Sequence, residues 1–244
     1  MWHVNNSDDA MRTPANENPA TGLQSYLGGK TNRHNNNKQK TNNTMSKVNP
    51  IQGIKANIQC QCGTVKGSID SPSALRFVCY SKDCRGYYNA LNALAKNAGK
   101  PEAAALDPFG GCDFTQIYPC EITIREGQDQ LETRLIRKNS PIPRTYARCC
   151  FTPLFSTGGT GAALLNSNLL SAWDQHCEVK YRIIGRHALK GDGSVPKPSM
   201  SWSVPFGWFF AMPKRCQPDK AQPSPVEVKD INELKLVEGF VEGK

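Results

Sequence analysis

The sequence predicts a mainly β fold with a few helices, and three observations lead to this expectation. Apolar and polar residues alternate with a period of two on either side of Gly63, which is the pattern of two strands joined by a tight turn. Further short runs of strand-forming residues follow, separated by Gly-rich turn signals. Three cysteine clusters lie among these runs. We therefore expect a compact β domain over residues 50–157, with residues 158–244 as a C-terminal extension.

The first 49 residues are expected to be disordered. They are rich in Asn, Lys, Gly and Thr with few apolar residues, so they cannot bury enough surface to offset the entropy lost on ordering. The whole chain has 38% hydrophobic residues and a mean hydropathy of -0.53, in keeping with a segment outside any core. Two alternatives stay open: Met45 is the true initiator, or the segment is a divergent targeting peptide with Arg12 and Arg33 among its Ser and Thr residues.

The first elements of the domain are a hairpin, a strand and a helix. The hairpin is expected over 54–69, which places the first cysteine pair at its tip. A short strand over 75–80 runs into the second cysteine cluster. A helix is expected over 85–96, because Tyr88 and Leu91 recur at helical spacing.

The remaining elements alternate between strands and turns. Further strands are expected over 114–119, 121–126, 130–137 and 146–151. The pattern changes after Thr157, where 162–173 has the composition of a helix and 191–198 is a Gly/Pro loop.

Composition limits the classes of function. The formal net charge is +9, but no dense Lys/Arg block and no recognition motif accompanies it, which argues against specific nucleic-acid binding. The apolar stretch 204–212 contains Pro205 and Gly207 and is far shorter than the ~20 residues of a membrane-spanning helix. No HExxH, P-loop, GxSxG or GxGxxG motif is present. Ten cysteines without a secretory signal indicate reduced thiols in an intracellular protein, which we expect in the cytoplasm, with the nucleus or an organelle left open.

The cysteine clusters predict zinc sites, since thiolates are the preferred ligands of tetrahedral zinc. The clusters are Cys60-Gln61-Cys62-Gly63, then Cys79 to Cys84, then Cys149-Cys150. Adjacent cysteines point to opposite faces of an extended strand, so Cys149 and Cys150 either serve one site each or one of them is simply buried. The isolated cysteines are expected to pack as small apolar residues: Cys112, Cys120, Cys177 and Cys216.

The order of these motifs resembles a known family. CxCG, then C-x-S-x-x-C-R, then a Gly-Gly and strand block, then an aromatic residue before a cysteine turn, is similar to the glutathione-dependent formaldehyde-activating enzymes and centromere protein V. The blocks Gly110–Ile117 and Arg144–Leu154 look most like an uncharacterised branch with an RWYAxCCxTP motif. The resemblance covers about 59–157 and implies an Mss4-like β fold.

The resemblance also implies two zinc sites. The first would use Cys60, Cys62 and Cys150, with Cys149 as a further candidate ligand. The second would use Cys79 and Cys84, with Ser81 at the place of a third thiol. A serine hydroxyl is a poor ligand beside thiolates, so this second site either keeps an open position or has lost its metal.

Two classes of function follow from these sites. The resemblance implies carbon–sulfur lyase chemistry, in which a glutathione thiol adds to formaldehyde, with Ser81 and Arg85 as substrate-binding residues and no catalytic residue assigned. Arg85 is equally well read as an ordinary surface or capping cation. The alternative is a non-catalytic zinc domain that binds a partner or a polyanion. The sequence leaves the oligomeric state open.

Overall fold

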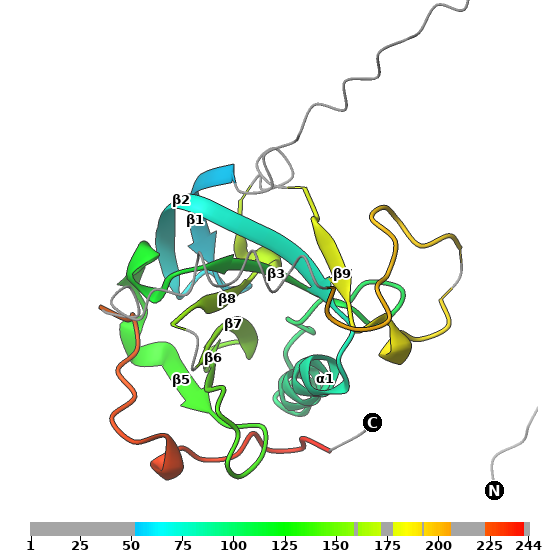
Figure 1. The fold of residues 1–244 in the computed structure, drawn as a ribbon. Coiled ribbons are helices and arrows are strands. Elements are labelled where there is room, and N and C mark those ends of the chain that lie inside the picture. The colour runs from blue at the N-terminus through cyan, green and yellow to red at the C-terminus, as the bar shows by residue number, and fades with distance from the viewer. Residues whose placement is uncertain (1–51, 159–160, 172–177, 192, 206–222, 242–244) are drawn as a thin grey trace, which may run out of the picture. The chain divides into compact units, whose positions relative to one another are not determined.

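The computed structural model describes residues 52–158, 161–171, 178–191, 193–205 and 223–241 (Figure 1). The expected disordered segment, the cysteines at 177 and 216 and most of the apolar stretch 204–212 lie outside these residues. A nine-stranded sheet dominates the described part, and one long α-helix packs against it. The expectation of a mainly β fold with few helices is confirmed. No helix among the described residues is long and apolar enough to cross a membrane.

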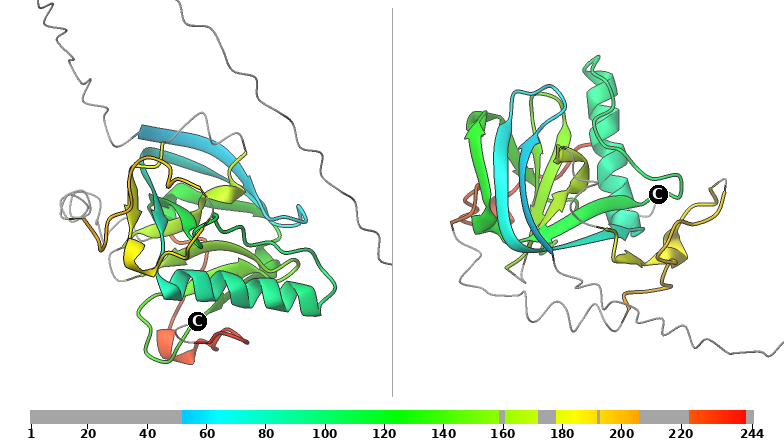
Figure 2. Two further views of the ribbon diagram at one scale, coloured as in Figure 1. Left: turned by 90° about the vertical axis from the view of Figure 1, so that its right-hand side faces the viewer. Right: turned by 90° about the horizontal axis from the view of Figure 1, so that it is seen from above.

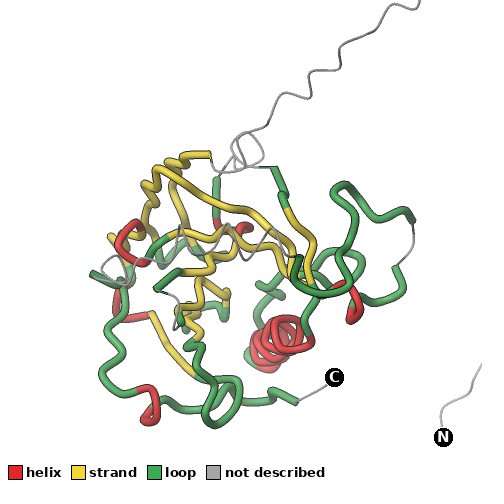
Figure 3. Tube along the Cα trace, in the orientation of Figure 1, coloured by secondary structure: helices red, strands yellow, loops and turns green. Residues whose placement is uncertain are grey.

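The long strand β2 (Lys66–Cys79) organises the sheet. It forms an antiparallel hairpin with β1 (Gln52–Gln59), and its 14 residues merge the second hairpin strand with the short strand expected over 75–80. Its first half is flanked by β1 and β4, and its second half by β3 and β9. This change of neighbours lets one strand take part in both regions of the curved sheet (Figures 1 and 3).

The other strands continue from β2 in the order β3, β8, β7, β6 and β5. All these pairs are antiparallel, and β9 adds to β2 in parallel. The bounds are β3 Cys112–Ile117, β4 Ile122–Glu126, β5 Leu131–Arg134, β6 Arg144–Ala147, β7 Thr152–Thr157, β8 Ala163–Asn166 and β9 Tyr181–Ile183. Strands β8 and β9 show that residues after 157 complete the same sheet.

The helix expected over 162–173 is wrong where the chain is described. Strand β8 and a 3-10 turn, Ser167–Leu169, occupy its place. Asn166 donates to the Pro153 carbonyl (2.9 Å) and accepts from the Asn168 amide (3.1 Å). Such side-chain bonds to the backbone compete with helix formation, and β8 fills the position between β3 and β7. The short apolar run at 163–166 forms a strand that is almost entirely buried.

Helix α1 (Lys82–Asn97) begins three residues before the predicted start at residue 85. The Ser81 hydroxyl caps it by accepting from the Cys84 amide (3.2 Å). The helix packs against β3 and β7, and its buried face includes Tyr88 and Leu91 (Figure 2). Leu91 is fully buried, so its truncation to alanine would cost about 2–5 kcal/mol. This packing fixes the N-terminal turn of α1 against the ends of β2 and β3.

Candidate metal centre

The first cysteine pair lies in the turn between β1 and β2, as the sequence predicts. The Cys60 amide donates to the Val65 carbonyl (3.0 Å), and the Gly63 amide donates to the Cys60 carbonyl (2.9 Å). Gly63 has a φ of 76°, in the left-handed region that glycine adopts at little cost. The turn therefore brings Cys62 back over Cys60, with the two sulfur atoms 3.5 Å apart.

The adjacent cysteines Cys149 and Cys150 lie in a turn rather than in a strand. The strand expected over 146–151 ends at Ala147, and Phe151 adopts a left-handed φ of 59° while its amide donates to the Ala147 carbonyl (2.7 Å). Cys149 and Cys150 therefore do not point to opposite faces, because side chains alternate in this way only in an extended chain. A tight turn lets both side chains point to the same side.

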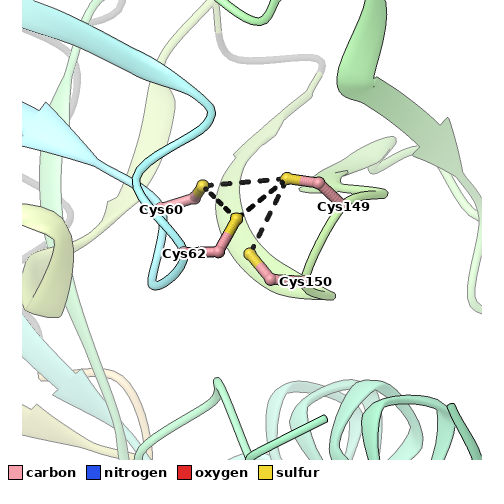
Figure 4. A group of neighbouring side chains, drawn as sticks. All are labelled: Cys60, Cys62, Cys149 and Cys150. Carbon is pink, nitrogen blue, oxygen red and sulfur yellow. Dashed lines mark hydrogen bonds between the residues drawn. The ribbon is translucent and has the colours of Figure 1, made fainter. Parts of the chain in front are cut away.

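The two turns bring four sulfur atoms together at one surface site (Figure 4). We call Cys60, Cys62, Cys149 and Cys150 the four-thiol cluster. The distance between sulfur atoms is 3.4 Å for Cys62 to Cys149, 3.8 Å for Cys60 to Cys149 and 3.9 Å for Cys149 to Cys150. All four sulfur atoms lie within 4.8 Å of one another.

These separations are those that a tetrahedral ion requires. Four sulfur atoms at ~2.3 Å from a zinc ion stand about 3.8 Å apart along the edges of the tetrahedron. Cys60 and Cys150 are buried, whereas Cys62 is exposed, so the cluster has a protected base and an open side. The cluster can therefore hold a metal ion.

Polar groups around the cluster favour thiolate sulfur. The Val65 amide donates to Cys60 Sγ (3.2 Å), and the Thr152 hydroxyl lies 2.9 Å from Cys150 Sγ. Thr152 also accepts from the Gln61 amide (3.1 Å), so a single hydroxyl links the two turns. Hydrogen bonds of this kind orient metal ligands and hold the charge of thiolates.

The thiols of the cluster differ in pKa. Hydrogen bonding with Cys60 lowers the pKa of Cys150, and the same contact together with burial raises the pKa of Cys60. Burial raises the pKa of Cys149 to about 11. Without a cation the cluster thus keeps protons on some sulfurs, and a bound metal ion would release them.

The cysteines of the second predicted zinc site, Cys79 and Cys84, lie in the core. Cys79, at the end of β2, hydrogen bonds through its thiol with Cys84, in the first turn of α1. We call Cys79 and Cys84 the buried thiol pair; their residues are 5% and 8% exposed. Among the described residues, the four-thiol cluster is the only set of three or more candidate ligands that converge in this way. A metal role for the buried pair stays a prediction.

A buried arginine lies beside this pair. Arg144, the first residue of β6, places Nη1 and Nη2 each 3.9 Å from Cys84 Sγ. Hydrogen bonding from the Cys79 thiol, followed by the charge of Arg144, lowers the pKa of Cys84 to about 5 despite burial. The guanidinium group also lies over the ring of Tyr87, 5.1 Å from its centroid. The pKa of Cys84 is therefore lowered beside a cation that belongs to the chain itself.

The two predicted substrate-binding residues make contacts inside the fold. Ser81 caps α1. Hydrogen bonding with its hydroxyl also favours a lower pKa at both Cys84 and Cys79. Arg85 is 6% exposed, and its Nη1 donates to the His187 carbonyl (2.8 Å). A role for either residue in substrate binding stays a prediction.

Sequence reasoning missed Arg144 and Thr152 as residues of these sites. Arg144 lies 60 residues from Cys84 along the chain, and no spacing rule links a strand arginine to a helix cysteine. Thr152 follows Cys150 by two residues, a proximity that indicates a turn contact only once the turn is known. Cys112 is opposite Cys79 in the β2–β3 register and fully buried, as expected of a packing residue.

Residues 45–197 match DUF6151, which is described as a family of unknown function. The chain belongs to this family. The matched segment of this DUF6151 protein contains both the four-thiol cluster and the buried thiol pair.

Other comparisons are distant. No curated protein matches the chain. A crystal structure of a Rhodobacter sphaeroides protein, solved as a structural genomics target, is similar with a TM-score of 0.33 and 13% identity, over 50% of this chain and 96% of that one. Neither the DUF6151 match nor this structure shows an Mss4-like fold or the formaldehyde-activating family, so both stay predictions.

Proposed function

We propose that the protein binds one zinc ion at the four-thiol cluster and that the ion has a structural role. The observation that carries this proposal is the convergence of four sulfur atoms within 4.8 Å of one another. Soft thiolates in a tetrahedral arrangement select zinc or iron among common metals, and zinc requires no redox partner.

A structural role is supported by what the ion would join. In the sheet order, the β1–β2 hairpin is separated from the β6–β7 hairpin by β3 and β8. Cys60 and Cys149 are 89 residues apart, so an ion between their turns closes a long loop of the chain. Closing a long loop removes much of the entropy of the unfolded chain. The ion would thereby hold the curved sheet shut at one end.

A complete sulfur shell also favours structure over catalysis. Catalytic zinc sites usually keep one position for water or substrate, whereas structural sites have four protein ligands. The four-thiol cluster supplies all four ligands. The carbon–sulfur lyase activity implied by the resemblance would instead need an ion at the buried thiol pair, beside the positive charge of Arg144.

Metal content by elemental mass spectrometry on the full chain, purified under reducing conditions, tests the proposal. We expect one zinc per chain in the wild type, in Cys84→Ser and in the control Cys120→Ser, which changes a cysteine outside the cluster. Cys60→Ser and Cys150→Ser should each lose the ion. Iron in place of zinc would correct the metal, and a wild type without metal would contradict the proposal.

The lyase prediction has its own assay. Formaldehyde should be depleted only when glutathione is present, and Cys84→Ser should abolish the depletion. An inactive wild type that carries one zinc ion would leave the structural proposal standing and remove the lyase prediction.

A further inference from the structure

The buried thiol pair is placed next to a positive charge that belongs to the chain. Arg144 is 4% exposed, and both of its terminal nitrogens lie 3.9 Å from Cys84 Sγ. A divalent cation bound to the same sulfur would lie within several ångströms of this guanidinium, where water is largely excluded and like charges repel strongly. Arg144 thus makes the site suitable for a thiolate without a metal.

The start of α1 favours the same thiolate. Cys84 is the third residue of a 16-residue helix, and Ser81 caps that helix. Amide groups in the first turn of a helix carry partial positive charge, which stabilises an anionic side chain there. A capped helix N-terminus and a guanidinium group therefore lie beside one thiol, and hydrogen bonding with Ser81 also lowers its pKa.

The partner of this thiolate is a second thiol. Cys79 hydrogen bonds with Cys84 through its side chain, and β2 and α1 hold the two residues on either side of Tyr80 and Ser81. A thiolate in contact with a thiol has the composition of a dithiol that can close to a disulfide. The four-thiol cluster is separate from this pair.

Unpartnered polar groups surround the pair. Among the described side chains, Arg144 Nε and the hydroxyls of Tyr87 and Tyr88 are buried without a hydrogen-bond partner. All three belong to residues that are 4% exposed or less. Burial raises the pKa of Tyr88; the charge of Cys84 raises it further, and the charge of Arg144 opposes the rise. Buried polar groups without partners would be satisfied by a small polar molecule that can both donate and accept. A hydroperoxide has this chemistry.

We infer that Cys79 and Cys84 form a redox-active dithiol that a small hydroperoxide oxidises to a disulfide. The Cys84 thiolate attacks one peroxide oxygen, the O–O bond breaks, and the departing oxygen takes a proton to leave as an alcohol or water. The Cys79 sulfur then attacks the sulfenic acid on Cys84, the S–S bond forms, and water leaves with the Cys79 proton. The two thiols lose two electrons, which the peroxide gains.

Peptide mapping of the full, metal-loaded chain tests this inference. The protein is treated with hydrogen peroxide, blocked with a thiol alkylator and digested with trypsin without reduction. Trypsin cuts after Arg76, Lys82 and Arg85, so the two cysteines fall in separate peptides, 77–82 and 83–85. We expect these peptides to appear as one disulfide-linked species that added dithiothreitol separates again.

Variants define the roles of the residues. Cys79→Ser should trap the sulfenic acid, which dimedone then labels at Cys84. Arg144→Gln should slow oxidation at least tenfold, Arg144→Lys should slow it less, and the control Cys120→Ser should leave the rate unchanged. If Arg144→Gln fails to fold, the dimedone adduct in Cys79→Ser still decides the question.

Several outcomes would overturn the inference. These are an unreactive Cys84 in the wild type, a disulfide from Cys79 to its cross-strand neighbour Cys112, or a second metal ion per chain that Cys84→Ser removes. Metal at the four-thiol cluster is measured on the same sample, so failure of this inference is distinguishable from failure of the zinc proposal.

Discussion

The four-thiol cluster and the buried thiol pair place thiolate charge in opposite surroundings. The cluster joins two surface turns, has two buried and two more accessible cysteines, and gathers enough sulfur to enclose an ion. The buried pair lies between β2 and α1, and Arg144 supplies its positive charge. The comparison teaches that the surrounding cation, more than the presence of cysteines, decides what a thiol cluster does. Four thiols that converge on one point favour a metal, and the nearby Lys100 ammonium donates to the Cys149 carbonyl. Two thiols beside a buried guanidinium favour thiol chemistry.

The largest expected effect concerns metal removal from the four-thiol cluster. Chelation of the wild type, or Cys60→Ser, should lower the melting temperature by at least about 10 °C, since several kcal/mol of loop-closing energy are lost. Cys84→Ser should respond to the chelator as the wild type does. Thermal unfolding followed by circular dichroism measures both, and an unchanged melting temperature after proven metal loss would show that the ion is not structural.

Removal of the buried cation should have the next largest effect. Arg144→Gln leaves the Cys84 thiolate without its counter-charge, and we expect about 2–4 kcal/mol less stability, because one partner of a buried charge pair remains. Urea unfolding at neutral pH under reducing conditions gives the difference. The metal content should stay at the wild-type value; its loss would show that the two regions are not independent.

A pH dependence separates the two regions further. The folded-state pKa of Cys84 is about 5, below the ordinary thiol value of 9.0, so the unfolded chain binds more protons between these values. The stabilisation by this thiolate is complete above pH 9 and is lost as pH falls through about 5. The stability difference between wild type and Cys84→Ser should therefore grow by about 4 kcal/mol from pH 5.5 to 8.5, since each pH unit between the two pKa values changes it by about 1.4 kcal/mol. A difference that is constant with pH would mean that Cys84 is not ionised.

The smallest effect is expected at the polar link between the two cysteine turns. Thr152→Val removes a bond to the Gln61 amide and another to Cys150, which should cost about 1 kcal/mol and weaken metal binding by roughly tenfold to a hundredfold. Competition with a coloured zinc chelator measures the affinity. Thr152→Ser is the matched control, because it keeps the hydroxyl; equal losses in both variants would indicate a packing effect.

The local elements were predictable where a single period or turn signal decided them. The β1–β2 hairpin with its cysteine tip and helix α1 follow from alternation around Gly63 and from the helical spacing of Tyr88 and Leu91. The segment at β8 was mistaken for a helix, because a short apolar run does not distinguish a buried strand from a helix. Only its two neighbours in the sheet, β3 and β7, decide the matter.

The sequence by itself determined that this chain is mainly β and that its cysteines fall in clusters. Both properties depend only on residues that are close together along the chain. The tertiary structure decided which clusters meet. The turn at Phe151 points Cys149 and Cys150 to one side, and the curved sheet brings them to Cys60, 89 residues away. It also placed Arg144 against Cys84, a contact between a strand and a helix 60 residues apart. Such long-range contacts depend on how the elements pack, so no local pattern of residues contains them.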